Sequence, residues 1–307
     1  MKVVGMGRWQ VYHIAHSVAD ALDALARAPG PARVIAGGTD LLLDIEQGRH
    51  PPVHTLVDIT RIPELTAIAL RPDGLYIGAA APLSRIVTSP LVVHHAQALA
   101  QACALIGGPQ VRNVATLGGN VAHALPAADG AIALIALDAT AEIADRRGRR
   151  CQPVAELYRG PGRSALDPQG ELIVGFHLPL RREGQASAFR RVMRPQGVAI
   201  AILNMAVWLE RQGDVITAIR IAAGPTGPVP RRLTATEQAL CGCAATETAL
   251  AEALTALLAE AHFRSSPHRS SAAYRRHLAA VLLRETVMAA WDEAGSVRAE
   301  AVPTVAS

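Results

Sequence analysis

The sequence predicts an α+β protein built from two domains. The chain has 307 residues, which is enough for two or three compact units that each have a core. Its first part alternates helix, strand and glycine turn, whereas later parts consist of β-hairpins followed by helices. Half of the residues are hydrophobic but only 3% are aromatic, so the cores must consist mainly of Ala, Val, Leu and Ile.

The N-terminal segment predicts a small α/β unit. Apolar residues recur at helical spacing over Ser17–Ala28, and Ser17 is suited to cap that helix. A short buried strand over Arg33–Ala36 then runs into a glycine turn, and a second helix is expected from Asp40. Another apolar strand, His54–Ile59, is expected to pair alongside.

The pattern then changes to β-hairpins with helices between them. The first hairpin is expected over Leu65–Leu70 and Leu75–Ala79, and the second over Ala139–Ala144 and Arg149–Val154. Helices are expected near Leu91–Leu105 and Asp129–Leu137, and a strand over Glu171–Leu178 closes the region.

A break in composition at Arg181–Gln185 predicts a domain boundary, with one domain over residues 1–180 (subdomains of about 1–60 and 61–180) and a second over 186–295. In the second domain we expect a hairpin over Val198–Leu209 and Val215–Ala223. Three helices should follow, over Thr234–Leu240, Ala245–Ala261 and Ser271–Trp291, and residues 296–307 are expected to form a flexible tail.

Charge and cysteine content exclude several classes of function. The arginine cluster Arg146–Arg150 has no aromatic neighbours for stacking bases, so it is interpreted as a solvated turn and no nucleic acid is expected. The four cysteines match no metal-site spacing and are typical of reduced thiols in a cytoplasmic protein. No signal peptide is evident in Met1–Ala15, and the longest apolar run is too short for a membrane span.

Two glycine-rich segments are the candidate binding sites. The first, Ala36–Asp40, lies between a strand and a helix; its paired glycines would let backbone N–H groups approach a phosphate, and the helix would add its positive end. Taken alone, such a turn is more often only a tight connection. The second runs from Gly107 through Thr116–Asn120 to Asp129, and its apolar neighbours and few charges are unusual for a solvent loop.

Neither segment matches the Rossmann, P-loop, zinc-protease or nucleophile-elbow motifs. Pattern alone therefore gives two candidate diphosphate loops.

A family resemblance is more specific. The string Val34–Leu42 resembles the first FAD loop of the medium subunit of the xanthine dehydrogenase and carbon monoxide dehydrogenase family, and Gln110–Asn120 with Pro126–Asp129 resembles the second. Flanking segments and parts of the C-terminal half, including Arg269–Arg275, also fit the family. The resemblance covers nearly the whole chain and implies a two-subdomain FAD-binding domain of the PCMH type, as in the vanillyl-alcohol oxidase-like superfamily, followed by a C-terminal domain of antiparallel sheet plus helix bundle.

The resemblance implies that FAD is the only cofactor held by this chain, because no cysteine-rich insertion for an iron–sulfur cluster is present. It implies no catalytic residue and no metal ligand. The cofactor-binding residues that it implies are Arg33, Val34, Ile35, Ala36, Gly37, Gly38, Thr39, Asp40, Leu41, Ile106, Val111, Ala115, Thr116, Gly118, Gly119, Asn120, Ala122, Ala128, Asp129, Ile173 and Arg191.

Arg191 is included because the family often places a cation near the flavin, where it would stabilise the reduced anionic form. Arg190 and Arg194 are adjacent candidates for that position, and a surface role for Arg191 is an equal alternative.

The resemblance also implies partners. A large molybdopterin-binding subunit would oxidise the substrate, and a small iron–sulfur subunit would relay electrons to this FAD, in a dimer of heterotrimers. The FAD would then reduce NAD⁺, a quinone or another acceptor. Two alternatives stay open: a self-contained flavin oxidase or reductase, for which three Phe, four Tyr and three Trp offer few groups above a flavin, and a scaffold without flavin.

Overall fold

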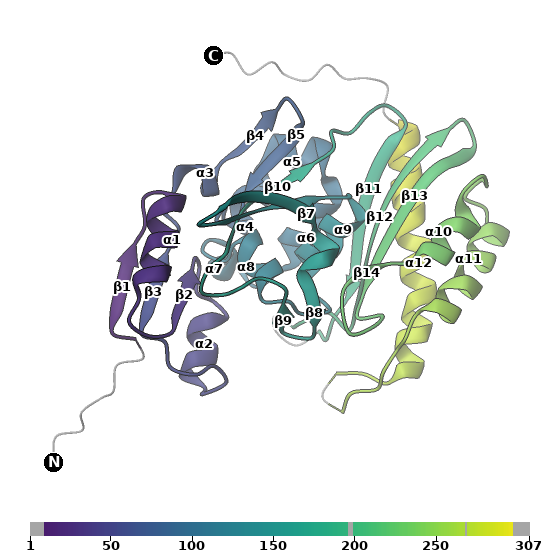
Figure 1. Cartoon of the computed structure of the whole chain (residues 1–307). Coiled ribbons are helices and arrows are strands. Elements are labelled where there is room, and N and C mark those ends of the chain that lie inside the picture. Colours follow the sequence, from purple (N-terminus) through teal and green to yellow (C-terminus); the bar gives the residue numbers. More distant parts are fainter. Residues whose placement is uncertain (1–8, 196–198, 268, 297–307) are drawn as a thin grey trace.

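The computed structural model describes residues 9–195, 199–267 and 269–296. The chain runs from a small N-terminal unit through a central α+β unit to a C-terminal sheet that is covered by helices (Figure 1). This arrangement confirms the predicted α+β class.

The N-terminal unit is a parallel sheet of three strands in the order β1-β3-β2. Helix α1 begins after Ser17, whose hydroxyl accepts the N–H of Asp20 at 3.1 Å, and it buries one apolar face. The predicted helices and strands of this unit are confirmed. The elements are β1 (Val11–Ile14), α1 (Val18–Arg27), β2 (Ala32–Ile35), α2 (Leu41–Glu46) and β3 (Thr55–Asp58).

The central unit contains an antiparallel sheet in the order β4-β5-β10-β6-β7. Both predicted hairpins and the closing strand are present, but the first hairpin begins later than expected because Leu65 and Thr66 belong to a short helix. The elements are α3 (Pro63–Thr66), β4 (Ile68–Arg71), β5 (Gly74–Gly78), β6 (Thr140–Asp145), β7 (Gly148–Pro153), η1 (Val154–Leu157), β8 (Tyr158–Gly160), β9 (Arg163–Ser164) and β10 (Leu172–Leu178).

Helices cover this sheet and carry the second glycine segment. The single helix expected over Leu91–Leu105 is divided at Ala96, and the segment expected to be a loop contains two short helices, α7 and α8. The helices are α4 (Leu83–Thr88), α5 (Pro90–His95), α6 (Gln97–Leu105), α7 (Pro109–Arg112), α8 (Leu117–Ala122) and α9 (Asp129–Ala136).

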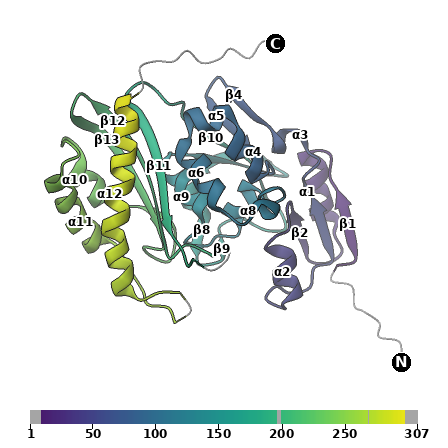
Figure 2. The same ribbon diagram turned by 180° about the vertical axis from the view of Figure 1, so that it is seen from behind.

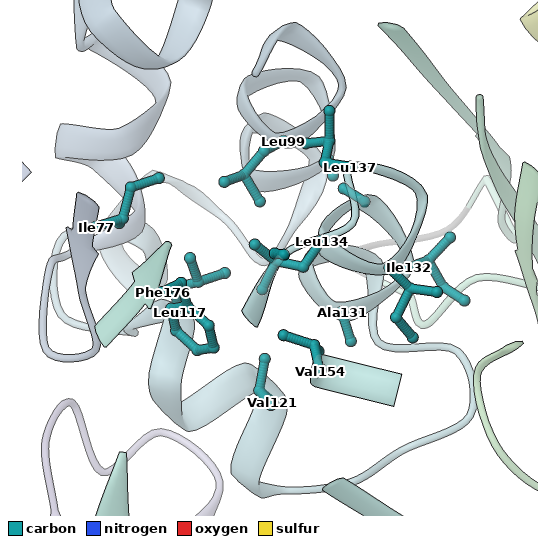
Figure 3. Packing of buried hydrophobic residues seen from close by; sticks show 14 of the residues in the cluster. Ile77, Leu99, Leu117, Val121, Ala131, Ile132, Leu134, Leu137, Val154 and Phe176 are labelled. Atoms are coloured by element: carbon teal, nitrogen blue, oxygen red, sulfur yellow. The ribbon is translucent and has the colours of Figure 1, made fainter. Parts of the chain in front are cut away.

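The largest core lies between α6, α8, α9 and the central sheet (Figure 3). Leu117 and Val121 of α8 point into it and are fully buried, near Phe176 of β10 and Val154. Because α8 is only six residues long, this burial rather than helix propensity must hold it in place.

The C-terminal unit is an antiparallel sheet in the order β11-β12-β13-β14, with three helices. The sequence analysis missed β11 and began the next strand too early, since β12 starts at Leu203; Val198 and the predicted tail beyond residue 296 lie outside the described residues. The elements are β11 (Gln185–Val192), β12 (Leu203–Gln212), β13 (Val215–Gly224), β14 (Arg231–Arg232), α10 (Thr234–Leu240), α11 (Glu247–Glu260) and α12 (Ala272–Ser296).

The C-terminal sheet is packed on both faces. One face contributes Phe189 and Ala206 to the central core, next to α6 and α9. The other face packs against the long helix α12, as the view from behind shows (Figure 2). The C-terminal sheet therefore joins the two domains, because it packs against the central unit on one face and against α12 on the other.

The arginine-rich turn is the predicted hairpin between β6 and β7. Its cations are largely neutralised, because Arg149 binds Glu64 and Glu142, and Arg150 contacts Glu171 at 2.7 Å.

Within the described residues, every helix is too short or too polar to cross a bilayer.

One glycine in the central sheet is required by its neighbour. Tyr76 is fully buried, and its hydroxyl lies 3.1 Å from the carbonyl of Glu64 and 3.2 Å from that of Val174. A Cβ at Gly175 would lie 2.4 Å from the Tyr76 ring. Neither the buried ring nor the strand backbone has room to move, so a side chain at this position overpacks the sheet.

We therefore expect Gly175→Ala to lower the free energy of unfolding by about 1–3 kcal/mol, measured by urea denaturation. Gly227→Ala is the matched control, since a Cβ there meets nothing nearer than 3.8 Å. Equal stability of the two variants would contradict the overpacking argument.

Candidate functional site: two glycine segments and a buried ion pair

The first glycine segment connects β2 to α2 and presents free backbone donors. Among the described residues, no acceptor takes the N–H groups of Gly37, Gly38, Thr39 or Asp40. Gly38 has φ +67°, a conformation that favours glycine, and this turns the chain into the helix. The result is a row of amide donors at a helix N-terminus, which suits a diphosphate.

The two glycine segments touch each other through Gly37. A Cβ at this position would lie 2.0 Å from the carbonyl oxygen of Val114 and 2.8 Å from the nitrogen of Ala115. The neighbouring atoms are backbone and have no alternative rotamer, so only glycine permits the contact. Segments about eighty residues apart in sequence are thereby brought together.

The second segment opens helix α8, and its glycine amides are used inside the protein. Thr116 caps the helix by accepting the N–H of Gly119 at 3.2 Å, while Gly118 donates to the carbonyl of Ala79 at 2.8 Å. Gly119 itself is exposed. The free amide donors therefore lie in the first segment, and the second contributes the positive end of α8 and an open surface.

Asn120 links α8 to the start of α9. Its Oδ1 is buried without a hydrogen-bond partner among the described residues. A Cβ at Gly130 would lie 2.7 Å from that oxygen, so the glycine leaves room for the amide beside Asp129.

Asp129 forms a buried ion pair across the two domains. Its carboxylate binds Arg191 of β11, and it accepts a hydrogen bond of 2.5 Å from Asn204 of β12. The side chains of Asp129 and Arg191 are 6% and 5% exposed, so water hardly screens the pair. Burial raises the pKa of Asp129, and the Arg191 charge and the Asn204 hydrogen bond oppose that rise.

The three candidate arginines have different hydrogen-bond partners. Only Arg191 reaches Asp129, because Arg190 donates to Gln101 and Arg194 to the carbonyl of Arg269.

The other predicted cofactor-binding residues differ in their burial and in their contacts. Arg33 contacts His50 at 3.3 Å, and Val34 and Ile35 belong to the small N-terminal cores. Ile106 is half-buried, whereas Val111 is 38% exposed near the start of the second segment. Residues Ala36, Leu41, Ala115, Ala122 and Ala128 line the same segments, with Ala115 and Ala128 buried and Ala122 exposed.

Ile173 lies on strand β10, outside both glycine segments. It is 5% exposed in the central core, next to Val174, whose carbonyl accepts the N–H of Ala79. Ala79 in turn accepts the N–H of Gly118, so these backbone hydrogen bonds link the strand that carries Ile173 to the start of α8.

Sequence reasoning missed Asn204 and Val114. Asn204 is fully buried in a strand, and a lone polar residue within the apolar run Val198–Leu209 was the available signal. Val114 had none, since its contribution is a backbone carbonyl.

The unpartnered atoms of the site fit a polyhydroxyl cofactor. Within the part of the chain that the structure describes, Asn120 Oδ1 and Asn204 Oδ1 lack donors and the Nε of Arg191 lacks an acceptor, although all three atoms are buried. Such atoms are costly to leave unpaired. Hydroxyl groups supply both donors and acceptors, and the free amides of the first segment suit a diphosphate, so the residues present fit a dinucleotide such as FAD.

This fold and site define a class of protein suited to an extended dinucleotide cofactor, with an α/β subdomain followed by an α+β subdomain. Two family models match this chain and describe the same class of protein. Residues 5–181 match the model of the FAD binding domain in molybdopterin dehydrogenase, and residues 187–290 match that of the CO dehydrogenase flavoprotein C-terminal domain.

Individual relatives are similar over nearly their whole length. The xanthine dehydrogenase FAD-binding subunit of Escherichia coli is 32% identical over 92% of this chain and 97% of its own. The carbon monoxide dehydrogenase medium chain of Hydrogenophaga pseudoflava is 31% identical over 91% and 96%.

Solved structures are equally similar. A structure of carbon monoxide dehydrogenase from Hydrogenophaga pseudoflava has a TM-score of 0.86 and 31% identity, over 92% of this chain and 97% of that one. Quinoline 2-oxidoreductase from Pseudomonas putida 86 has a TM-score of 0.85 and 28% identity, over 93% and 98%. The chain therefore belongs to the FAD-binding medium subunits of the molybdenum hydroxylase family, a family of oxidoreductases.

The buried ion pair generates a prediction about stability. We expect Asp129→Asn to lower the free energy of unfolding by about 3–5 kcal/mol, because Arg191 would keep its charge in a buried place without a counter-charge. Urea denaturation measures the change. Asp214→Asn, in an exposed pair with Arg211, should leave stability almost unchanged. If both variants behave alike, the Asp129 pair does not join the domains.

Proposed function

We propose that this chain binds one FAD along the line from the first glycine segment to Asp129 and passes electrons through it. The observation that carries the proposal is the row of free amides at Gly37–Asp40, which lies beside the second segment and its buried unpartnered atoms. The cofactor-binding residues named from the family resemblance are proposed to hold this FAD, within a cofactor domain of residues 1–180 that precedes a second domain of residues 186–295.

The proposed roles follow from the chemistry of each part. The amides of Gly37–Asp40 and the N-terminus of α8 bind the diphosphate, and Asn120 and Asp129 bind hydroxyl groups of the cofactor. Arg191 lies beside Asp129, where its positive charge favours a reduced, anionic flavin.

The partners are proposed from the family. Relatives of this chain are FAD subunits or medium chains of xanthine and carbon monoxide dehydrogenases, and the names imply further chains. We infer a large molybdopterin-binding subunit that oxidises the substrate and a small iron–sulfur subunit that delivers electrons to FAD, in a dimer of heterotrimers. NAD⁺ is the proposed acceptor, with a quinone as the alternative. The four free cysteines favour a reducing compartment such as the cytoplasm.

The first test concerns flavin binding. Purified protein should release FAD on acid treatment, in a ratio of one per chain. We expect Asn120→Ala to weaken FAD binding about 10-fold, since it removes a cofactor hydrogen bond. The melting temperature without FAD should stay the same, because Asn120 Oδ1 has no hydrogen-bond partner among the residues that the structure describes. Gly227→Ala is the control. Absence of FAD in the complete complex would contradict the proposal and favour a scaffold role.

The second test concerns the electron acceptor. Under anaerobic conditions NADH should bleach the flavin of the FAD-loaded chain, because hydride transfer to FAD is the reverse of NAD⁺ reduction. A flavin that NADH leaves oxidised but a reduced quinone bleaches would point to a quinone instead. Substrate oxidation by this chain alone, without partner subunits, would favour the self-contained oxidase.

A further inference from the structure

A second buried arginine, Arg275, has no counter-charge in the described part of the chain. It lies in the first turn of α12 and is only 1% exposed. Its Nε and Nη1 are buried and have no hydrogen-bond partner, and no ion pair of Arg275 occurs within residues 9–195, 199–267 and 269–296. A buried guanidinium in this condition is strongly unfavourable unless an anion approaches it.

The surroundings of Arg275 are basic. The pKa of Arg275 is lowered by burial and, further, by the charges of Arg264 and Arg269. The chain has no Asp or Glu between Glu260 and Glu285. The preceding carboxylate in the sequence, Glu260, accepts hydrogen bonds from the N–H and hydroxyl of Thr236. The local charge is therefore unbalanced.

The segment before α12 also offers neutral donors. Ser266 and Ser270 form an antiparallel bridge, and Arg264 and Arg269 are exposed. Ser265 and Ser271 bind the first amides of α12, so they fix the segment to the helix N-terminus. Serine hydroxyls and guanidinium groups bind phosphate in proteins, and the positive end of the α12 dipole adds to their field.

The location is distinct from the proposed FAD site. Arg181 precedes β11 and contacts Glu293 near the end of α12. The beginning of α12 therefore lies near the other end of β11, which carries Arg191. Arg275 precedes Leu278 and Ala279, which pack on the α12 face of the sheet, whereas Arg191 faces Asp129 on the other. Arg194 binds the carbonyl of Arg269 and connects the two regions.

We propose that Arg275, with Arg264 and Arg269, forms a binding site for a phosphate-class oxyanion at the N-terminus of α12. The anion neutralises the buried guanidinium. Its source is either free phosphate or the phosphate group of a nicotinamide dinucleotide, which present the same chemistry to the site.

Thermal unfolding of the full chain, saturated with FAD so that its own diphosphate site is filled, tests the proposal. Inorganic phosphate is titrated against sodium chloride of equal ionic strength. We expect phosphate to raise the melting temperature saturably, by about 3–6 °C, and chloride to have no saturable effect. Arg275→Gln should abolish the phosphate response, and Arg27→Gln, an exposed arginine on α1, should retain it.

A second variant guards against a failure of Arg275→Gln to fold. Arg269→Gln removes an exposed charge and should raise the half-saturating phosphate concentration about fivefold. Saturation by NADH at much lower concentration than phosphate, with the same dependence on Arg275, identifies the dinucleotide as the source; equal concentrations identify free phosphate. The proposal is overturned if phosphate acts no differently from chloride, or if Arg269→Gln leaves the response unchanged.

Discussion

The buried pair between Asp129 and Arg191 is the interaction on which the relation of the two domains depends. Asp129 begins α9 in the central unit, and Arg191 ends β11 in the C-terminal sheet. Removing two charges from water is unfavourable, and only close, hydrogen-bonded geometry offsets that cost. Asn204 supplies part of the geometry. The pair thus makes the packing of α9 on the C-terminal sheet specific, where apolar contacts alone would allow sliding.

The rest of the site is built outward from this point by close backbone contacts. Gly130 leaves room for Asn120, Gly118 lies against Ala79, and Gly37 lies against Val114. In each case the missing Cβ serves protein packing first. The glycines bring the first segment, the residue after β5 and helices α8 and α9 close together. Preorganisation of this kind lowers the entropy cost of binding an extended cofactor.

The sequence predicted the fold class and most long elements because their patterns are local. The α1 face and the β6–β7 hairpin depend on neighbours in sequence, and both were found. Helix α8 was taken for a loop, since a six-residue segment with two glycines has poor helix propensity and is held by the burial of Leu117 and Val121. The contact of Gly37 with Val114 and the choice of Arg191 over Arg190 depend on tertiary packing, which spacing does not encode.

The C-terminal sheet separates two buried arginines that differ in one respect. Arg191 faces the central unit and has Asp129 as its counter-charge, while Arg275 faces the sheet from α12 and has none among the described residues. The same desolvation cost applies to both groups. Because a folded chain does not retain an uncompensated buried charge without gain, the asymmetry itself points to an anion from outside the chain. The end of β11 and the start of β12 would then be held from both faces, by an internal carboxylate on one and a bound ligand on the other.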